Sequence, residues 1–171
     1  MNDISAAALS QLAELGRDPK KSVRFPDKSV IVRCETLPWT PWALKGSWFK
    51  LLYINRSVSM SVALIKIDKG TQTPDHFHFG EAHAYVLQGN FGYEHGLAFK
   101  GDHLVEGGGI AHKPVIGPEE DLITFSIFFG GLGGVNPDGT VDGCCGCDAM
   151  YDMAAANGAA DHLEPPPAKR Y

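Results

Sequence analysis

The sequence predicts an all-β fold that closes into a sandwich or small barrel, with short helices on its flanks. Short segments rich in Val, Ile and aromatic residues recur along the chain, and turn residues separate them at close intervals. The 171 residues, of which 44% are hydrophobic, suffice for one domain with its own core. We therefore expect a helix and loop over 1–28, a single barrel with a C-terminal helix over 29–163, and a tail over 164–171.

The elements are predicted in chain order from periodicity and turn residues. A helix is expected from Ile4 to Leu15, because apolar residues recur at helical spacing and Gly16 follows as a stop. A polar loop with two prolines comes next. Strands are then predicted at Ser29–Cys34, Gly46–Tyr53, Ser57–Asp68, around His76–His78, and at Ala84–Leu87, Phe91–His95, Phe99–Val105 and Asp121–Phe129.

The C-terminal part of the chain contains one further predicted helix. Residues 130–146 are rich in glycine and are expected to form a surface excursion. The helix is predicted from Asp148 to Asn157, with Asp148 as the N-cap and Gly158 as the stop.

Composition excludes some classes of function. The net charge of -5 and the lack of a basic run argue against a nucleic-acid surface. No run of apolar residues is long enough for a membrane span, and the N-terminus lacks the pattern of a signal peptide, so a cytoplasmic location is expected. The clustered Cys144, Cys145 and Cys147, with only the distant Cys34 as a fourth, predict a reduced loop in preference to a zinc site.

The segment from Gly70 to Gly89 carries the strongest chemical signal. It contains His76-Phe77-His78, and residues i and i+2 of a strand project from the same face. Two neutral imidazoles placed in this way form half of a site for a first-row transition metal. A glycine-rich turn downstream leads to a third candidate, His112.

Together these features resemble the two signature motifs of the cupin superfamily. The matching positions are Gly70, His76, His78 and Gly89 in the first motif and Gly101, Gly109 and His112 in the second. The usual glutamate position of the first motif falls on Ala82, between Glu81 and His83. In the second motif Gly107 replaces the proline, and no asparagine follows His112.

One branch of the superfamily is more similar still. His83-Ala84-Tyr85 and the Asp138-Gly139 pair resemble 2,4'-dihydroxyacetophenone dioxygenase and its relatives, over about residues 45 to 163. The resemblance implies a jelly-roll (double-stranded β-helix) barrel and a homodimer. It also implies Fe(II), with Zn, Ni and Mn as alternative metals.

The resemblance assigns His76, His78 and His112 as metal ligands. Two candidates are open for a fourth inner group, which would ligate the metal or accept a substrate proton. Glu94 is favoured by counting alternate residues from Ala82 through the next turn, and His83 is favoured by the resemblance. Glu106 is a third acidic candidate, beside the ligands and not among them.

The implied activity is cleavage of a carbon–carbon bond next to a ketone by O2, with an aryl α-hydroxyketone such as 2,4'-dihydroxyacetophenone as substrate. A β-diketone is the alternative substrate, and a zinc-binding sensor without turnover is the alternative function. The aromatic residues available to a pocket are Phe77, Phe79, Tyr85, Phe91 and Tyr93. His95, His103 and His162 are expected to be solvated and receive no role.

Overall fold

The computed structural model describes Ala6, Ser10 and residues 22–167. The predicted helix from Ile4 to Leu15 therefore lies outside the described residues, apart from these two helical positions. The chain divides into a unit that ends at Leu37 and a unit that begins at Pro38. No helix in the described part of the chain is long and apolar enough to cross a membrane.

The described part of the first unit is a short hairpin. Strands β1 (Val23–Arg24) and β2 (Val30–Ile31) pair antiparallel, and a 3-10 turn, η1 (Cys34–Thr36), follows. In the connecting turn the backbone N–H of Ser29 donates to the carboxylate of Asp27 at 2.9 Å. The strand predicted at Ser29–Cys34 is observed only as β2, over Val30–Ile31.

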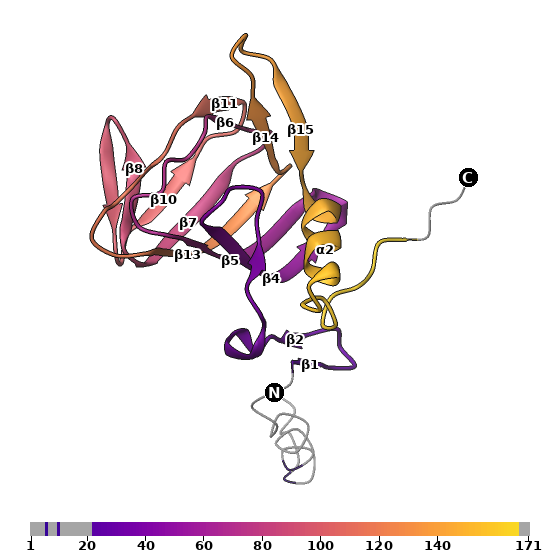
Figure 1. Ribbon diagram of the computed structural model, residues 1–171. Coiled ribbons are helices and arrows are strands. Elements are labelled where there is room, and N and C mark those ends of the chain that lie inside the picture. The colour runs from indigo at the N-terminus through magenta and orange to yellow at the C-terminus, as the bar shows by residue number, and fades with distance from the viewer. Residues whose placement is uncertain (1–5, 7–9, 11–21, 168–171) are drawn as a thin grey trace, which may run out of the picture. The chain divides into compact units, whose positions relative to one another are not determined.

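The second unit is built on a six-stranded antiparallel sheet with the order β10-β7-β13-β5-β4-β3 (Figure 1). Its strands are β3 (Thr40–Pro41), β4 (Ser47–Asn55), β5 (Met60–Ile67), β7 (Ala82–Gln88), β10 (His103–Glu106) and β13 (Leu122–Phe129). A 3-10 turn, η2 (Arg56–Val58), joins β4 to β5, where the Asn55 side chain accepts from the backbone N–H of Ser57. Alternate residues of β7 and β13 are buried, as expected for a sheet with one face on the core.

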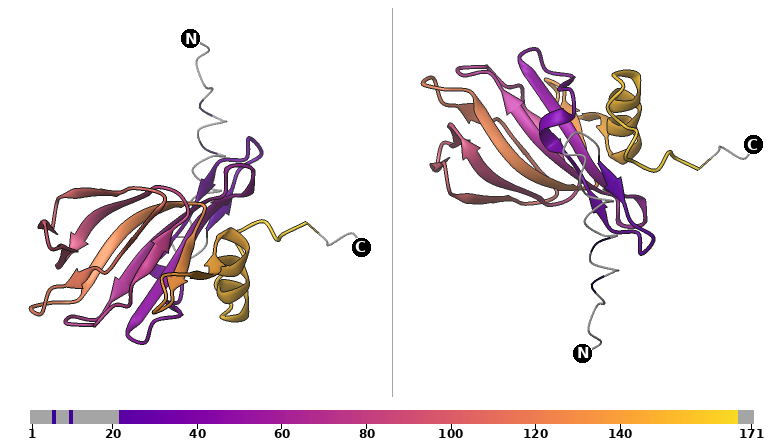
Figure 2. Two further views of the ribbon diagram at one scale, coloured as in Figure 1. Left: turned by 90° about the horizontal axis from the view of Figure 1, so that it is seen from above. Right: turned by 90° about the horizontal axis from the view of Figure 1, so that it is seen from below.

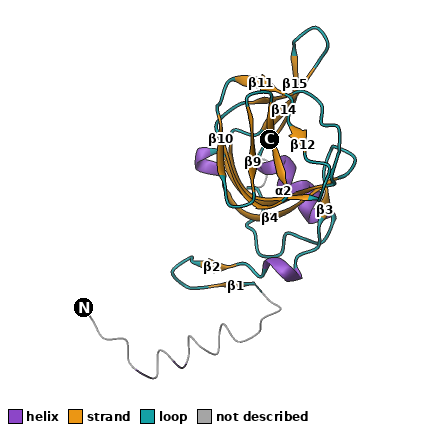
Figure 3. Cartoon of the chain, turned by 90° about the vertical axis from the view of Figure 1, so that its left-hand side faces the viewer, coloured by secondary structure: helices purple, strands orange, loops and turns teal. Residues whose placement is uncertain are grey.

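Two smaller sheets face it and complete the barrel (Figure 3). One has the order β11-β6-β14-β15, with β6 (His76–His78), β11 (Ile110–His112), β14 (Leu132–Val135) and β15 (Val141–Cys145). The other has the order β12-β8-β9, with β8 (Asn90–Tyr93), β9 (Gly96–Phe99) and β12 (Val115–Ile116). The β14–β15 hairpin occupies the segment 130–146, which is more regular than the excursion predicted there.

Helix α2 (Cys147–Ala156) packs beside the sheet at β4 and β15 (Figure 2). Its buried Met150 and Ala154 join Phe49, Leu51 and Ile65 in the larger of two apolar clusters. The N-cap is Gly146, because Cys147 is already helical. Asp148 thus lies in the first turn, where its carboxylate accepts from the Arg56 guanidinium at 2.6 Å, and the predicted N-cap was two residues too late.

The strands and the short helix confirm the predicted all-β fold. The second apolar cluster lies between the large sheet and the β12-β8-β9 sheet, and it contains Ala84, Val86, Phe91, Ala98, Ile116 and Leu122. The interior next to β6 and β11 is instead occupied by polar side chains.

Candidate metal centre

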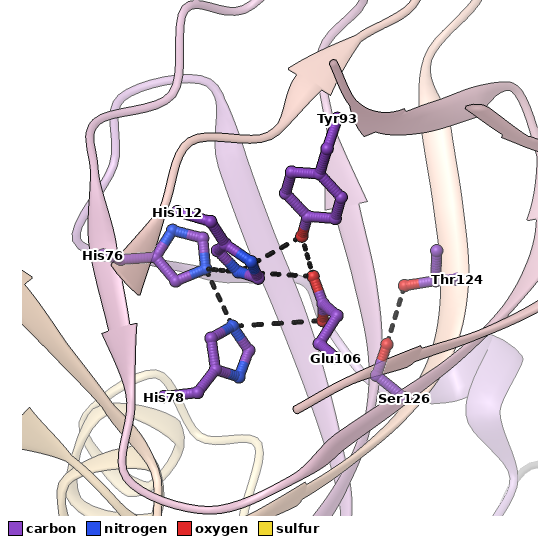
Figure 4. Close-up of polar contacts among 7 residues, drawn as sticks. All are labelled: His76, His78, Tyr93, Glu106, His112, Thr124 and Ser126. Carbon is purple, nitrogen blue, oxygen red and sulfur yellow. Dashed lines mark hydrogen bonds and ion pairs between the residues drawn. The ribbon is translucent and has the colours of Figure 1, made fainter. Parts of the chain in front are cut away.

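Three imidazoles from two adjacent strands converge inside the barrel (Figure 4). His76 and His78 project from the same face of β6, and His112 of β11 lies directly opposite His76 in the ladder. The Nε2 atom of His76 lies 3.0 Å from that of His78 and 3.2 Å from that of His112. The structure therefore brings together the three histidines predicted from the motifs, and this group could bind a metal ion.

The three imidazoles are neutral at pH 7. Burial, then the nearby His76 and His112, lowers the pKa of His78 to about 3. Burial, then His76, lowers the pKa of His112 to about 4. Burial also lowers the pKa of His76, although the Pro74 backbone and the charge of Asp75 oppose it. Each ring can therefore offer a lone pair to a cation, which is the form that a metal requires.

The spacing of the nitrogen atoms fits a shared ion. With metal–nitrogen bonds of about 2.0–2.1 Å, two ligand atoms lie about 2.9 Å apart at a right angle and about 3.3 Å apart at a tetrahedral angle. The distances of 3.0 and 3.2 Å between Nε2 atoms lie in this interval. One metal cation would satisfy all three lone pairs together, whereas a hydrogen bond between two rings needs a proton on one of them.

A carboxylate and a phenol complete the polar interior. Glu106, at the end of β10, is 9% exposed, and its oxygens lie 3.6 Å from Nε2 of His112 and 4.0 Å from Nε2 of His78. Tyr93 donates a hydrogen bond from its hydroxyl to Oε1 of Glu106, and that hydroxyl lies 3.2 Å from Nε2 of His112. The Tyr93 ring stacks on the His112 ring at a centroid distance of 4.3 Å.

Burial controls the protonation of this pair. It raises the pKa of Glu106, and the hydrogen bond from Tyr93 partly offsets that rise. The pKa of Tyr93 is raised first by burial and then by the charge and hydrogen bond of Glu106. The phenol therefore keeps its proton, and the carboxyl is the group of the two that can exchange one.

The structure does not bring Glu94 to the imidazoles. Its side chain is 84% exposed in the turn between β8 and β9, where the carboxylate lies 3.3 Å from His95. The alternation counted from Ala82 is interrupted at Gly89, which has a φ of +74° in the turn between β7 and β8. Phe91 is consequently buried, and the inner polar residue of β8 is Tyr93.

His83 likewise lies outside the imidazole group. It is on the outer face of β7, stacked on His103 at a centroid distance of 5.2 Å, and its Nε2 lies 2.7 Å from a carboxylate oxygen of Glu81. Odd-numbered residues of β7 point outward, since Ala82, Ala84 and Val86 are buried. His83, the candidate favoured by the resemblance, is therefore not the fourth inner group either.

One of the histidines that received no role also differs from expectation. His162 is half-buried, with Nε2 2.9 Å from the carbonyl of Leu51, and is not solvated as predicted. Cys34, Cys144, Cys145 and Cys147 form no disulfide bond. Among the described residues, the cysteines do not form a group that could hold a metal.

Sequence reasoning missed the role of Tyr93, which it treated only as a possible pocket aromatic. The available signal was Gly89: a glycine between two apolar segments indicates a turn that can reset the alternation of the following strand. Counting afresh from Phe91 as an inner residue would have placed Tyr93 inside the barrel.

Two cavities reach the centre from different sides. One, of about 1000 Å³, is lined by Tyr93, Glu106 and His112. The other, of about 310 Å³, is lined by His76 and by mainly apolar residues such as Trp42 and Ile67.

The barrel and the three converging imidazoles define the protein as a cupin with a candidate metal centre. Residues 27–129 match the ChrR cupin-like domain, and the chain belongs to this family. Membership confirms the predicted superfamily. No curated protein matches the chain.

Several solved structures share the fold. An RmlC-like cupin from Ralstonia eutropha is 24% identical, with a TM-score of 0.67 over 77% of this chain and 88% of that chain. A proposed acetylacetone dioxygenase from Methylibium petroleiphilum is 20% identical, with a TM-score of 0.66 over 81% and 99%. An acetylacetone dioxygenase from Acinetobacter johnsonii is 19% identical, with a TM-score of 0.54 over 93% and 89%. At these identities the likeness establishes the fold.

Proposed function

We propose that this protein is a non-haem iron(II) dioxygenase that cleaves a carbon–carbon bond next to a ketone. The observation that carries the proposal is the convergence of three neutral imidazoles, with Nε2 atoms 3.0 and 3.2 Å apart, inside a barrel. Two structures with the same fold are acetylacetone dioxygenases by name, one of them a proposed one, which supports this class of reaction.

His76, His78 and His112 would hold the metal through Nε2 and leave its positive charge uncompensated. A three-histidine set leaves open coordination positions, unlike a closed four-ligand structural site. Iron(II) there would supply a Lewis acid for a substrate that chelates through two oxygens, and the electrons that activate O2.

Glu106 is the group best placed to accept a proton from the substrate. Tyr93 occupies its Oε1, so Oε2 is free to accept the proton of a substrate hydroxyl or of an enol. Burial raises the pKa of this carboxyl, which brings it closer to the working pH of a general base. Tyr93 would fix the orientation of the carboxylate, and this pair takes the role first assigned to Glu94 or His83.

The substrate class that we propose first is an aryl α-hydroxyketone. Its ketone and hydroxyl oxygens would chelate the metal, and O2 would break the bond between the two oxygen-bearing carbons. Both atoms of O2 enter the products, an aryl carboxylic acid and formate. A β-diketone offers the same pair of oxygens, and the acetylacetone dioxygenases of the same fold favour it as the second candidate.

The test is oxygen consumption by protein that is purified without air and loaded with Fe(II). We expect O2 uptake with one of the two ketone classes and loss of this uptake in His112→Ala. With the aryl α-hydroxyketone, one aryl carboxylic acid and one formate should form for each O2 consumed. Tight metal binding without O2 uptake for either class would overturn the dioxygenase proposal and favour a metal-binding sensor. An unchanged metal content in His112→Ala would remove that residue from the ligand set.

We also propose that the protein is a homodimer. Apolar side chains form a row across the outer face of the large sheet, where Leu64, Phe125 and Tyr85 are cross-strand neighbours. Phe125 and Tyr85 are both exposed, and a self-complementary row of this kind suits a two-fold interface. Light scattering should give twice the chain mass, and Tyr85→Lys should halve it; a monomeric wild-type protein would contradict the proposal.

A further inference from the structure

His76 has different neighbours on its two sides. Strand β6 lies between β11 and β14, and His76 pairs with His112 on one strand and with Gly134 on the other. Directly opposed residues of antiparallel strands project from the same face, so a side chain at position 134 would stand next to the His76 imidazole. Glycine leaves that space open.

The open space is part of the smaller cavity of about 310 Å³. We call this cavity the Trp42 pocket; its principal lining residues are Trp42, Leu44, Ile67, His76, Leu132 and Gly134. His76 thus contributes to the wall of the pocket and to the imidazole group. A molecule bound at the centre could extend into the pocket without passing another strand.

The walls of the Trp42 pocket are mainly apolar, with Asp75 and His76 at one edge of the lining. The polar atoms of Trp42, Ser47 and Thr73 are bonded within the protein. The indole N–H of Trp42 donates to Sγ of Cys145 at 3.4 Å, and the hydroxyl of Thr73 donates to the carbonyl of Pro114. Trp42 is held by edge contacts with Phe49 and Phe128, at centroid distances of 5.9 and 6.1 Å. Such walls select an apolar group, because a polar one would lose its hydrogen bonds to water.

The larger cavity, on the other side of the centre, has a mixed lining that is more polar, with apolar side chains such as Leu104 and Ile110 beside charged ones. Its lining includes Glu106, Tyr93, Asp102 and Lys113 together with His112. Charged and hydroxyl groups there keep this side of the centre hydrated. The two sides of the centre are therefore chemically distinct.

We propose that the Trp42 pocket binds the apolar substituent of the ketone substrate, and that this substituent is a single aromatic ring. An apolar cavity of roughly 150 Å³ can hold benzene, so about 310 Å³ accommodates one substituted ring. The absence of a side chain at Gly134 sets the width of the pocket beside His76. The inference rests on the proposed function for the identity of the ketone, but not for the existence of the pocket.

The experiment narrows the pocket with Gly134→Val. Gly134 has no positive φ, and an added Cβ would meet only the Asp142 carbonyl, at an ordinary 3.7 Å. Gly107→Val is the matched control: it lines the larger cavity, and its Cβ would meet only Cδ1 of Ile110 at 3.9 Å. Gly134→Ala gives a graded and milder change.

The readout is binding, measured by calorimetry on Fe(II)-loaded protein without O2. The probes are 2-hydroxy-1-phenylethanone and its methyl counterpart, hydroxyacetone, with the 1-phenyl and 1-methyl β-diketones as a second pair. We expect the wild-type protein to bind the phenyl member of a pair at least tenfold more tightly. Gly134→Val should abolish this preference and leave the methyl member and the metal content unchanged, whereas Gly107→Val should keep the preference.

A phenyl preference that survives Gly134→Val, or equal weakening of both members of a pair, would overturn the pocket assignment. If Gly134→Val loses its metal or unfolds, the same binding measurement on Gly134→Ala tests the pocket assignment. In that variant we expect a smaller loss of the phenyl preference. Phenyl-selective binding without O2 uptake would overturn the dioxygenase proposal and leave the pocket standing. O2 uptake without a preference for the phenyl member would overturn the pocket assignment and leave the dioxygenase proposal standing.

Discussion

The Tyr93 hydroxyl and the Glu106 carboxylate share a hydrogen bond beside the three imidazoles. These residues come from β8 and β10, which belong to different sheets, so the barrel must close before the pair can form. The bond fixes one carboxylate oxygen and leaves the other directed to the centre. It also ties the orientation of Glu106 to the tyrosine ring that stacks on His112.

Glu106→Gln should lower kcat by roughly 10²-fold or more, which is the usual contribution of a general base. The amide keeps the size of the side chain but cannot accept the substrate proton. Iron content should remain near that of the wild-type protein, because Glu106 lies 3.6 and 4.0 Å from the nearest imidazole nitrogens and is not in the imidazole group. Loss of iron in this variant would show that Glu106 is a ligand instead.

Tyr93→Phe should have a smaller effect on kcat than Glu106→Gln, because it removes the positioning hydrogen bond and keeps the base. The ring that stacks on His112 is retained, so KM and metal content should change little. The pH profile of kcat should shift, since the phenol hydrogen bond lowers the pKa of Glu106. Removing that bond moves the profile of the base to higher pH; an unchanged profile would contradict the positioning role.

His83→Ala and Glu94→Ala should each leave metal content and kcat within about twofold of the wild-type values. Glu94 is 84% exposed, and His83 faces outward with Glu81 and His103. Surface substitutions of this kind usually change stability by about 0.5 kcal/mol or less. Metal analysis and oxygen uptake check both variants, and a tenfold loss in either would return that residue to the site.

The metal-free protein should lose stability as the pH falls from about 6.5 towards about 4. In the unfolded chain these histidines bind protons below about pH 6.5, whereas folded His78 and His112 do so only near about 3 and about 4. Each group can contribute at most about 1.4 kcal/mol per pH unit in this interval. Glu106 acts in the opposite direction, because its pKa is raised in the folded state.

Urea unfolding at several pH values, in the presence of a chelator, measures the effect. The slope of stability against pH should be smaller in His112→Gln than in the wild-type protein. Equal slopes between pH 6.5 and 5 would show that the folded His112 titrates normally.

Met150→Ala should destabilise the protein by about 2–5 kcal/mol, the usual cost of a large-to-small change in a core. Met150 is buried between α2 and the large sheet, and its sulfur accepts from the buried Ser61 hydroxyl at 3.4 Å. The half-buried Met153 on the same helix is the matched control, and its replacement by Ala should cost less. Chemical unfolding compares the two; similar losses would contradict the core role of Met150.

The sequence predicted the fold well where a strand is long and alternates clearly. The segments that became β4, β5 and β13 were placed within a few residues. In β5 and β13 the buried positions recur with period two, whereas β4 has four consecutive buried residues from Phe49 to Leu52. The β14–β15 hairpin was missed, because its glycines carry no apolar pattern. Strand β14 pairs with β6 and with β15, and this pairing stabilises the hairpin.

At the site, the three histidines were predictable because their spacing is local to two motifs. The fourth group was not, because it depends on how β8 and β10 approach each other across the barrel. Gly89 changes the alternation between β7 and β8, which moved the inner position from Glu94 to Tyr93. Glu106 lies at an inner position of β10, whose pairing with β7 is set by long-range contacts.

His76 pairs with β11 on one side and with β14 on the other, so the polar and the apolar side of the centre are built from different segments of the chain. Residues 93–113 supply Tyr93, Glu106 and His112 to one side of the centre, and residues 42–74 and 132–145 supply most of the apolar side, with His76 between the two. Substitutions in one set can therefore accumulate without disturbing the other. Under the proposed function, substitutions on β14 and around Trp42 would change which substrates bind and would leave His78, His112 and Glu106 in place.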